Sequence, residues 1–241
     1  MGKHERDTKP NDRKRRSAYW RPWRIVLLVI AALLFATGLY LWIEPQLRSR
    51  AQDDITQQML QGLQNGQDWF EVDPNANPVS GEGYDLLEEG PTPTPAQQKK
   101  VSVPIIGRIE IPCIGLDMPV ARGATTVNLR YAISWHEQTA AMGQKGQCVL
   151  FGHRMYQYGR HFNRLDEVTQ GQQIVLTDTR NGVRYTFNVY DVKTVLPEEV
   201  PALMMQMQSE PVLLLVTCTP VRVASHRLLV YARCTGQQAV Q

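Results

Sequence analysis

The sequence lacks the motifs that identify several common classes of protein. It contains no Cys-x-x-Cys pair, and the spacing of its four cysteines matches no zinc-binding pattern. It also contains no glycine-rich phosphate-binding loop and no regular alternation of strands with helices. These absences argue against a zinc-stabilised domain and against a nucleotide-binding α/β fold.

Basic residues are absent from residues 51–98, which carry nine Asp or Glu and no Lys or Arg. The charge is positive on either side of this segment. Residues 1–24 hold nine Lys or Arg against three acidic residues, and residues 99–241 hold fifteen against ten. In the longer segment the basic residues are scattered, and no nucleic-acid-binding motif accompanies them. Nucleic acid is therefore not an expected partner.

Charged residues are also missing from residues 25–43, which form one apolar stretch. About 20 apolar residues suffice to cross a bilayer as a helix, and aromatic residues such as Trp23 and Trp42 lie near both ends. The basic tail before the stretch predicts a cytoplasmic N-terminus and an extracellular remainder. A cleaved signal peptide is the alternative, but the apolar region is long and no Ala-x-Ala site directly follows it. We therefore expect a retained membrane anchor.

The next segment is expected to connect this anchor to a globular domain. Apolar residues at helical spacing in residues 44–63 predict that the anchor continues as an exposed helix. From residue 62 to residue 100 the composition shifts to Gly, Pro, Asn and acidic residues, and prolines alternate with threonines over residues 91–95. This composition favours a stiff, extended linker.

Short strand patterns dominate the rest of the chain. Asn181-Gly182 is typical of a tight hairpin turn between two of them. Several short strands in one domain favour a mainly-β fold built as a closed β-barrel with a few short helices. The predicted strands are residues 106–111, 118–121, 147–151, 173–177, 184–193, 212–218 and 228–234. The predicted helices are residues 128–132, 162–168 and 198–208. The predicted domains are a basic tail (1–24), a transmembrane helix (25–43), a helix with an acidic linker (44–100) and a β domain (101–241).

One of these strands ends in a thiol. Residues 212–218 form an apolar run that finishes at Cys218, and Pro220 then stops the strand because proline cannot donate a hydrogen bond to a neighbouring strand. A buried cysteine is usually inert packing, which is one reading of this residue. Its place at the end of the strand favours a functional reading. If Cys218 is a free nucleophile, an odd number of cysteines remains, so a disulfide scaffold is not expected.

Two further polar residues lie at strand ends. Arg227 begins the strand that follows Cys218, and His153 follows the apolar strand 147–151 after a single glycine. These three side chains can converge at one rim of a β-barrel. The thiol would then act as a nucleophile, the imidazole as an acid and base, and the guanidinium as an oxyanion or substrate clamp.

The arrangement resembles the sortase family. The matching segments are 215–220 (Leu-Val-Thr-Cys-Thr-Pro), 226–230 (His-Arg-Leu-Leu-Val), 152–154 (Gly-His-Arg) and, more weakly, 109–112 and 118–120. The resemblance implies that Cys218, His153 and Arg227 are catalytic and that Thr217 and Arg227 bind substrate. It also implies a catalytic domain at residues 101–241 on the outside of a Gram-positive-type cell membrane.

The resemblance further implies a reaction and its partners. Sortases cut a Leu-Pro-x-Thr-Gly-like signal of a secreted protein between Thr and Gly through a thioester, and transfer the acyl group to an amine. The acceptor would be a peptidoglycan precursor or a pilin lysine. No cofactor is required, and no carboxylate cluster in the sequence supports a modulatory Ca²⁺.

Other polar residues near these motifs are not expected to take part directly in catalysis. His136 matches a position at which sortases are expected to place a structural hydrogen bond. We expect His161 to be a surface or cap residue, and His226 to face away from Arg227 because side chains alternate along a strand. Arg154 is expected to be a surface residue or an outer support of the site.

Several alternatives remain open from the sequence. The segments around Cys218 and Arg227 resemble the pilin-polymerising and spore-former-type sortases, but the subclass is not settled. Pilin-polymerising sortases carry a lid with an Asp-Pro-aromatic motif, whereas here Asp73-Pro74 is followed by Asn75. The L,D-transpeptidases are disfavoured because their His-Gly-Cys segment is missing. A cysteine endopeptidase that uses water and a non-catalytic β domain that binds a cell-wall partner are the remaining rivals.

Overall fold

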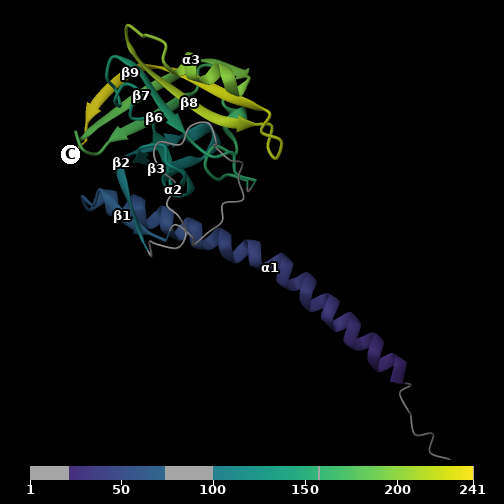
Figure 1. Ribbon diagram of the computed structural model, residues 1–241. Helices are drawn as coiled ribbons and strands as arrows, with labels where there is room; N and C mark the ends of the chain where they lie inside the picture. Colours follow the sequence, from purple (N-terminus) through teal and green to yellow (C-terminus); the bar gives the residue numbers. More distant parts are fainter. Residues whose placement is uncertain (1–21, 74–99, 157, 241) are drawn as a thin grey trace, which may run out of the picture. The chain divides into compact units, whose positions relative to one another are not determined.

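The computed structural model describes residues 22–73, 100–156 and 158–240, with the side chains of residues 22 and 44–53 excepted (Figure 1). The chain divides into two units between residues 47 and 48, and each unit is described by itself. The part of the acidic linker that could form a lid, the proline-rich spacer at 91–95 and most of the basic tail lie outside the described residues.

The first unit is the N-terminal part of helix α1 (Pro22–Gln64). Its segment Trp23–Ile43 is 21 residues long and apolar enough to cross a membrane. None of this segment is buried, and the successive side chains of Leu33, Leu34 and Phe35 are 61, 67 and 72% exposed. A helix that is apolar on all sides needs an apolar environment, which a bilayer provides. The length and composition therefore fit the expected membrane anchor.

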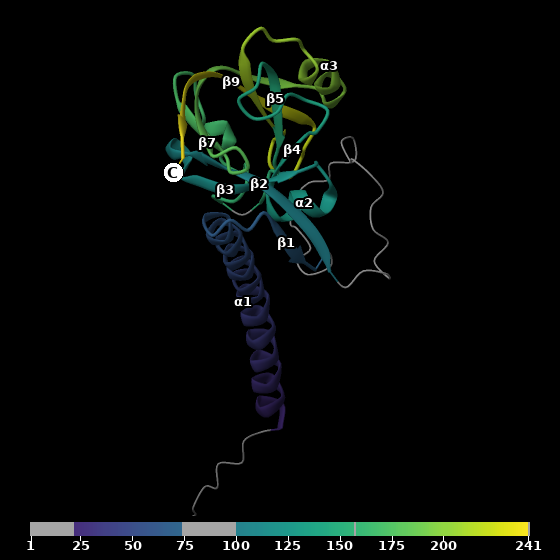
Figure 2. The ribbon, with the colours of Figure 1, turned by 90° about the vertical axis from the view of Figure 1, so that its left-hand side faces the viewer.

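The second unit is a β domain, and its described residues form nine strands. The strands are β1 (Trp69–Val72), β2 (Val101–Ile111), β3 (Leu116–Arg122), β4 (Ile133–Trp135), β5 (Gly146–Phe151), β6 (Gln173–Asp178), β7 (Val183–Val195), β8 (Pro211–Thr219) and β9 (His226–Ala239). The helices are α2 (Thr126–Tyr131), α3 (Val200–Met204) and the 3₁₀ turns η1 (Pro112–Ile114), η2 (Leu165–Glu167) and η3 (Pro197–Glu199). In Figures 1 and 2, α3 lies at the opposite end of this domain from β1.

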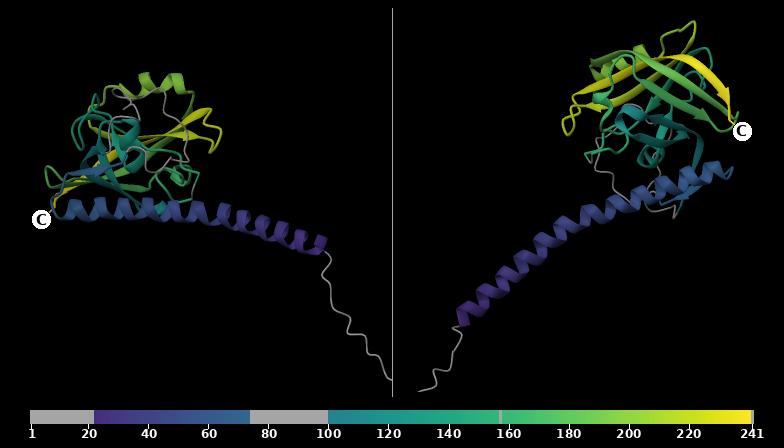
Figure 3. Two further views of the ribbon diagram at one scale, coloured as in Figure 1. Left: turned by 60° about the horizontal axis from the view of Figure 1, so that its bottom comes forward. Right: turned by 180° about the vertical axis from the view of Figure 1, so that it is seen from behind.

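The strands pair in the order β1-β2-β3-β4-β5-β8-β9-β7-β6, and β6 also pairs with β2. The pairings thus lead from β2 around the sheet and back to β2, which gives a barrel-like architecture. Most neighbours are antiparallel, whereas β3 with β4 and β5 with β8 are parallel. The long strands β7 and β9 run side by side along one wall (Figure 3). The predicted mainly-β fold is confirmed.

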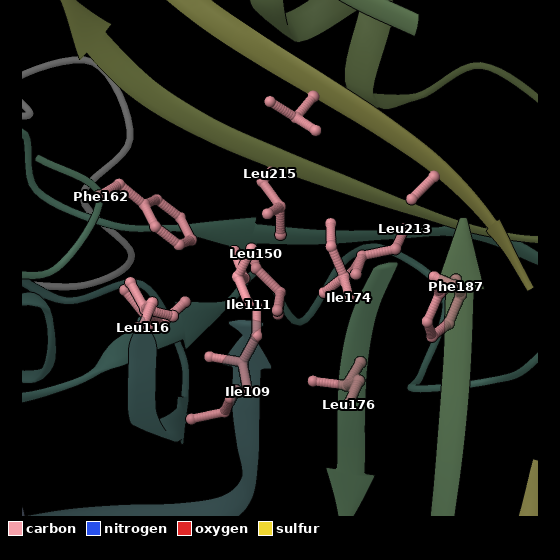
Figure 4. Packing of buried hydrophobic residues seen from close by; sticks show 14 of the residues in the cluster. Ile109, Ile111, Leu116, Leu150, Phe162, Ile174, Leu176, Phe187, Leu213 and Leu215 are labelled. Carbon is pink, nitrogen blue, oxygen red and sulfur yellow. The ribbon is translucent and has the colours of Figure 1, made fainter. Parts of the chain in front are cut away.

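Apolar side chains from most of the strands fill the interior of this sheet (Figure 4). Ile109 of β2, Leu150 of β5, Leu176 of β6 and Leu215 of β8 are all fully buried there. Phe162 reaches the same cluster from the loop after β5. These contacts hold the ends of β5 and β8, where the candidate site residues lie.

The folded domain extends further upstream than the boundary at residue 101 that the sequence suggested. Strand β1 pairs with β2, and the compact unit begins at residue 48. The last turns of α1 were expected to be exposed, but Met59 and Leu60 are buried. Met59 packs in a cluster that includes Val72 of β1 and Ile105 of β2. The expectation of a fully exposed helix was wrong because one face of these turns covers β2.

Candidate active site

Strand β8 presents its side chains alternately to two apolar clusters. Leu213 and Leu215 point into the interior of the barrel, whereas Leu214 and Val216 belong to a second cluster on the other face of the sheet. Cys218 continues this second row at the end of the strand. The period of two along a strand therefore carries the thiol out of the barrel interior and onto the opposite face.

Arg227 lies directly across from Cys218, because β8 and β9 pair antiparallel with these two residues in register. Residues opposite each other in an antiparallel pair present their side chains on the same face. The Nη1 group of Arg227 donates to the carbonyl oxygens of Ala224 (2.8 Å) and His226 (3.0 Å) in the β8–β9 connection. These bonds engage Nη1 alone, so they fix the guanidinium and leave its other N–H groups for a further acceptor.

His153 follows the end of β5, which runs parallel to β8 with Phe151 in register with Val216. The register continues beyond the strand, because the Gly152 N–H donates to the Val216 carbonyl (3.2 Å). The Thr217 hydroxyl also donates to the Gly152 carbonyl (2.8 Å). Extended two residues past the Phe151–Val216 pair, this register predicts that His153 lies beside Cys218.

The glycine before His153 is required by packing. A Cβ at Gly152 would lie 2.5 Å from Cδ2 of Phe162 and 2.6 Å from Cδ1 of Ile133, closer than real side chains approach. Gly152 thus allows the backbone after β5 to pack closely against Phe162 and Ile133. This close packing determines the position of the next residue, His153.

The three predicted catalytic side chains are all buried: Cys218 is 0% exposed, His153 6% and Arg227 7%. Hydrogen bonds and charges act more strongly in such a water-poor region than in solvent. A thiol, an imidazole and a guanidinium grouped in this way have the residue types needed for acyl transfer through a thioester. Thr217 is also buried, and its hydroxyl bond to Gly152 ties β8 to the residue before His153. The catalytic and binding roles of these residues stay predictions.

His161 lies elsewhere than expected. It is 6% exposed, so the prediction of a surface or cap residue was wrong. The loop after β5 folds back and forms a bridge between Arg154 and His161, which brings the His161 ring against the His153 ring with centroids 6.4 Å apart. Burial, helped by the nearby charges of His153 and Arg160, lowers the pKa of His161 to about 3. His161 is therefore neutral near pH 7.

Two further histidines, His136 and His226, lie in the described part of the chain. His136 is buried, and its ring lies edge-on to Phe151 with a centroid distance of 5.8 Å. The structural role expected for it stays a prediction. His226 is half-buried at the start of β9, where Nδ1 lies 2.9 Å from the Ser225 hydroxyl. It is paired with Thr219 rather than with Cys218.

Arg154 is not a surface residue. Its side chain is 3% exposed and forms an ion pair with Asp166 at 2.8 Å, while Nε and Nη1 have no partner among the described residues. Of the two expected positions, the one on the surface was wrong because the side chain is buried, and a role as an outer support of the site stays a prediction. A buried guanidinium of this kind supports the loop that carries His161.

The remaining cysteines differ in environment, and none forms a disulfide. Cys148 is buried in β5, and burial raises the pKa of its thiol to about 12. Cys113 is exposed, and Cys234 is half-buried. Among the described residues, no group of three or more His, Cys, Asp or Glu side chains forms a potential metal site.

Comparisons with known proteins identify a domain that covers this site. The family model described as "Sortase domain" matches residues 109–235, just over half of the chain. "Sortase A" of Bacillus anthracis is 31% identical over 135 residues, which cover 56% of this chain and 62% of that protein. "Sortase D" of Bacillus subtilis strain 168 is 27% identical over 130 residues, which cover 53% of this chain and 62% of that protein.

Solved structures agree with these matches. A crystal structure of Streptococcus agalactiae sortase C1 is 29% identical, with a TM-score of 0.51 over 55% of this chain and 68% of that one. The chain spans about three fifths of the length of the two curated relatives above. The match therefore concerns the domain that carries Cys218, His153 and Arg227.

Proposed function

The chain belongs to the sortase family, and we propose that it is a membrane-anchored cysteine transpeptidase. Its substrate is a secreted protein with a Leu-Pro-x-Thr-Gly-like C-terminal signal, which it cuts between Thr and Gly. The acyl group passes to an amine of a peptidoglycan precursor or of a pilin lysine. The catalytic domain lies outside a Gram-positive-type cell membrane, and the N-terminus lies in the cytoplasm.

The observation that carries this proposal is the shared face of three strand ends. Cys218 and Arg227 are paired across β8 and β9. The register of β5 with β8, extended two residues past Phe151, supports a position for His153 beside the thiol. Nucleophile, acid–base group and oxyanion donor are thus held by a hydrogen-bonded sheet. Preorganisation of this kind is the main source of rate enhancement in acyl transfer.

In the first half of the reaction, the Cys218 thiolate attacks the threonine carbonyl of the signal. The carbonyl electron pair moves to oxygen, and Arg227 donates hydrogen bonds to this oxyanion. The intermediate then collapses as the C–N bond breaks, and the glycine nitrogen leaves with a proton from the His153 imidazolium. The products are a thioester on Cys218 and a free glycine amine.

In the second half, the acceptor amine attacks the thioester carbonyl. Neutral His153 takes a proton from the attacking nitrogen, and Arg227 again stabilises the oxyanion. When the C–S bond breaks, the thiolate of Cys218 and the imidazolium of His153 are restored. No cofactor enters either half-reaction.

The test uses the full chain in detergent with a library of Leu-Pro-x-Thr-Gly-like peptides. Mass spectrometry should detect a thioester on the protein, and hydroxylamine should release the peptide as a hydroxamate. An added glycine-based amine should appear at the new C-terminus. Cys218→Ala should abolish all three signals, whereas Cys113→Ala removes an exposed thiol and should leave them unchanged.

Three outcomes would contradict the proposal. Cleavage above a few per cent of the normal rate in Cys218→Ala would exclude this residue as the nucleophile. Cleavage that yields only the free acid at saturating amine would indicate an endopeptidase that uses water. Absence of any cleavage or thioester across the library would favour a non-catalytic domain that binds a cell-wall partner.

A further inference from the structure

His161 is a buried polar residue in direct contact with the proposed acid–base histidine. The two rings pack at an interplanar angle of 64°, close to edge-to-face. The backbone reinforces this contact, because the Phe162 N–H donates to the His153 carbonyl (3.1 Å) and Arg154 bridges to His161. The loop after β5 therefore closes on itself so that residue 161 returns beside residue 153.

The conformation of His161 is unfavourable by itself. Its φ of 42° lies in the left-handed region, which disfavours a side chain other than glycine or asparagine. Its buried Nε2 atom has no hydrogen-bond partner among the described residues. An unpaired buried polar group destabilises the folded state. Features of this kind are kept where the surrounding structure holds them for a purpose, and they gather at functional sites.

His161 also lines a pocket. The pocket has a volume of about 260 Å³, and its walls include Thr56 of α1, Arg130 and Tyr131 of α2, and Arg160 beside His161. His153 is not among the described residues that line it. His161 thus borders both a pocket large enough for several water molecules and the ring of His153.

We infer that His161 is a positioning residue that fixes the ring of His153 and separates it from water in the adjoining pocket. The inference rests on the proposed role of His153. His161 does not touch the substrate or the reacting atoms, and it acts only through the orientation and hydration of His153.

The charges around the two histidines are compatible with this role. Cys218 and Arg227 lie on β8 and β9, the Arg154–Asp166 ion pair lies on the loop, and Arg160 precedes His161. Because burial lowers the pKa of His161 to about 3, this residue adds no positive charge next to His153 near neutral pH. A lysine or arginine at position 161 would repel the imidazolium that His153 forms during the reaction.

The test compares three variants of the full chain in detergent. His161→Gly suits the positive φ but removes the ring and joins the pocket to His153. His161→Asn also suits the backbone and fills part of the space. His161→Phe restores a ring of similar shape. The Hε1 signal of His153 in ¹³C-histidine-labelled protein, assigned by its loss in His153→Gln, reports protonation without any need for turnover.

Water stabilises the charged form of a histidine, so hydration should move the His153 titration to higher pH. We expect the midpoint of the His153 titration to be lowest in the wild-type protein, higher in His161→Asn and highest in His161→Gly. The midpoint of His161→Phe should be close to that of the wild-type protein. With a cleavable peptide, kcat should fall roughly tenfold or more in the Gly variant while KM stays within about twofold, and Phe should recover most of kcat.

An unchanged titration in both the Gly and Asn variants overturns the inference, and so does a Phe variant that folds but titrates like Gly. If circular dichroism shows that His161→Phe does not fold, the inference is judged from the His153 titrations of His161→Gly, His161→Asn and the wild-type protein. Failure of the proposed function has a different signature: wild-type protein would lack turnover altogether, whereas the titration could still be measured.

Discussion

At the scale of single residues, the position of His153 depends on the absence of one methyl group. Gly152→Ala would place a Cβ within 2.6 Å of both Phe162 and Ile133. Overpacking of this kind typically costs about 1–3 kcal/mol and moves the backbone. Because His153 is the next residue, we expect kcat/KM to fall roughly 10–100-fold. Peptide cleavage kinetics and thermal unfolding measure the two effects.

The matched control is Gly236→Ala on β9, where an added Cβ meets no atom within 4 Å. This variant should keep both its activity and its melting temperature. Normal activity in Gly152→Ala would show that the tight passage of β5 does not set the geometry of His153.

Arg227→Lys tests whether the guanidinium acts through its charge or through its shape. Lysine keeps the charge but loses the planar fork that can hold Ala224 and His226 carbonyls on one side and a substrate oxygen on the other. Loss of one oxyanion donor typically lowers the rate by about 10²–10³-fold. We expect kcat/KM to fall by roughly this factor in Arg227→Lys, and by more in Arg227→Ala.

Arg233→Lys is a suitable control for this prediction. Arg233 lies on the same strand, is exposed and forms only a long ion pair with Glu210 (3.4 Å) together with a contact to the Tyr190 ring. It should keep wild-type turnover. Arg154 cannot serve as this control because it is buried and paired with Asp166. Near wild-type kcat/KM in Arg227→Lys would assign the residue a purely electrostatic role.

The sequence predicted the residues on β8 and β9 because strand periodicity and the proline stop are local signals. Cys218 and Arg227 are indeed paired, and His153 follows the strand beside them. The burial of His161 and Arg154 was missed. Their positions depend on a loop that folds back to form a single β-bridge. The pattern of apolar residues in the sequence does not predict that a loop folds back in this way.

At the scale of elements, the described residues 48–73 belong to the same compact unit as the later strands. Met59 and Leu60 of α1 and Val72 of β1 are buried, and the Ile105 N–H of β2 donates to the Asp68 carbonyl (2.7 Å). Each fully buried side chain of this size contributes about 1.5–3 kcal/mol. The segment thus stabilises the domain by an amount comparable with a large part of a typical unfolding free energy of about 5–15 kcal/mol.

We therefore expect a fragment of residues 101–241 to be much less stable than a fragment of residues 48–241. Without the upstream segment, Val103 and Ile105 of β2 lose the cover that Met59 and Val72 provide. Urea denaturation followed by tryptophan fluorescence should give a midpoint lower by several molar units of urea or an unfolded short fragment.

The substitution Met59→Ala in the longer fragment is the finer version of this test. It leaves the chain intact and should cost roughly 2–5 kcal/mol, as large-to-small changes in a core do. Equal denaturation midpoints for the two fragments would mean that α1 and β1 contribute nothing to the fold.

The elements that the sequence did not predict share a physical cause. Strand β4 has three residues and β1 has four, too few for a pattern of alternation to appear. Each is defined by its partner instead: β4 lies between β3 and β5, and β1 lies at the edge beside β2. The longer strands β7, β8 and β9 were predicted because their own sequences are long enough to show the pattern of a strand.

At the scale of the whole molecule, the chain combines a β domain with an N-terminal helix that is apolar on all sides. Within residues 25–43 no residue is charged, and the whole segment Trp23–Ile43 is unburied. A protein that carries such a helix in water would expose a large apolar surface and aggregate. A bilayer removes this surface from water, and a retained anchor would also keep the sortase domain at the membrane surface.

The full chain should therefore sediment with membranes, resist extraction by alkaline carbonate and be released by detergent, whereas residues 48–241 alone should remain soluble. In intact cells, added protease should cut the domain after residue 44, and an epitope before residue 24 should stay protected, because basic flanks are retained in the cytoplasm. Fractionation and immunoblotting with both epitopes measure these properties. A form cleaved just after residue 43 and found in the culture medium would show that the apolar stretch is a signal peptide, and a protected domain with an accessible N-terminus would reverse the orientation.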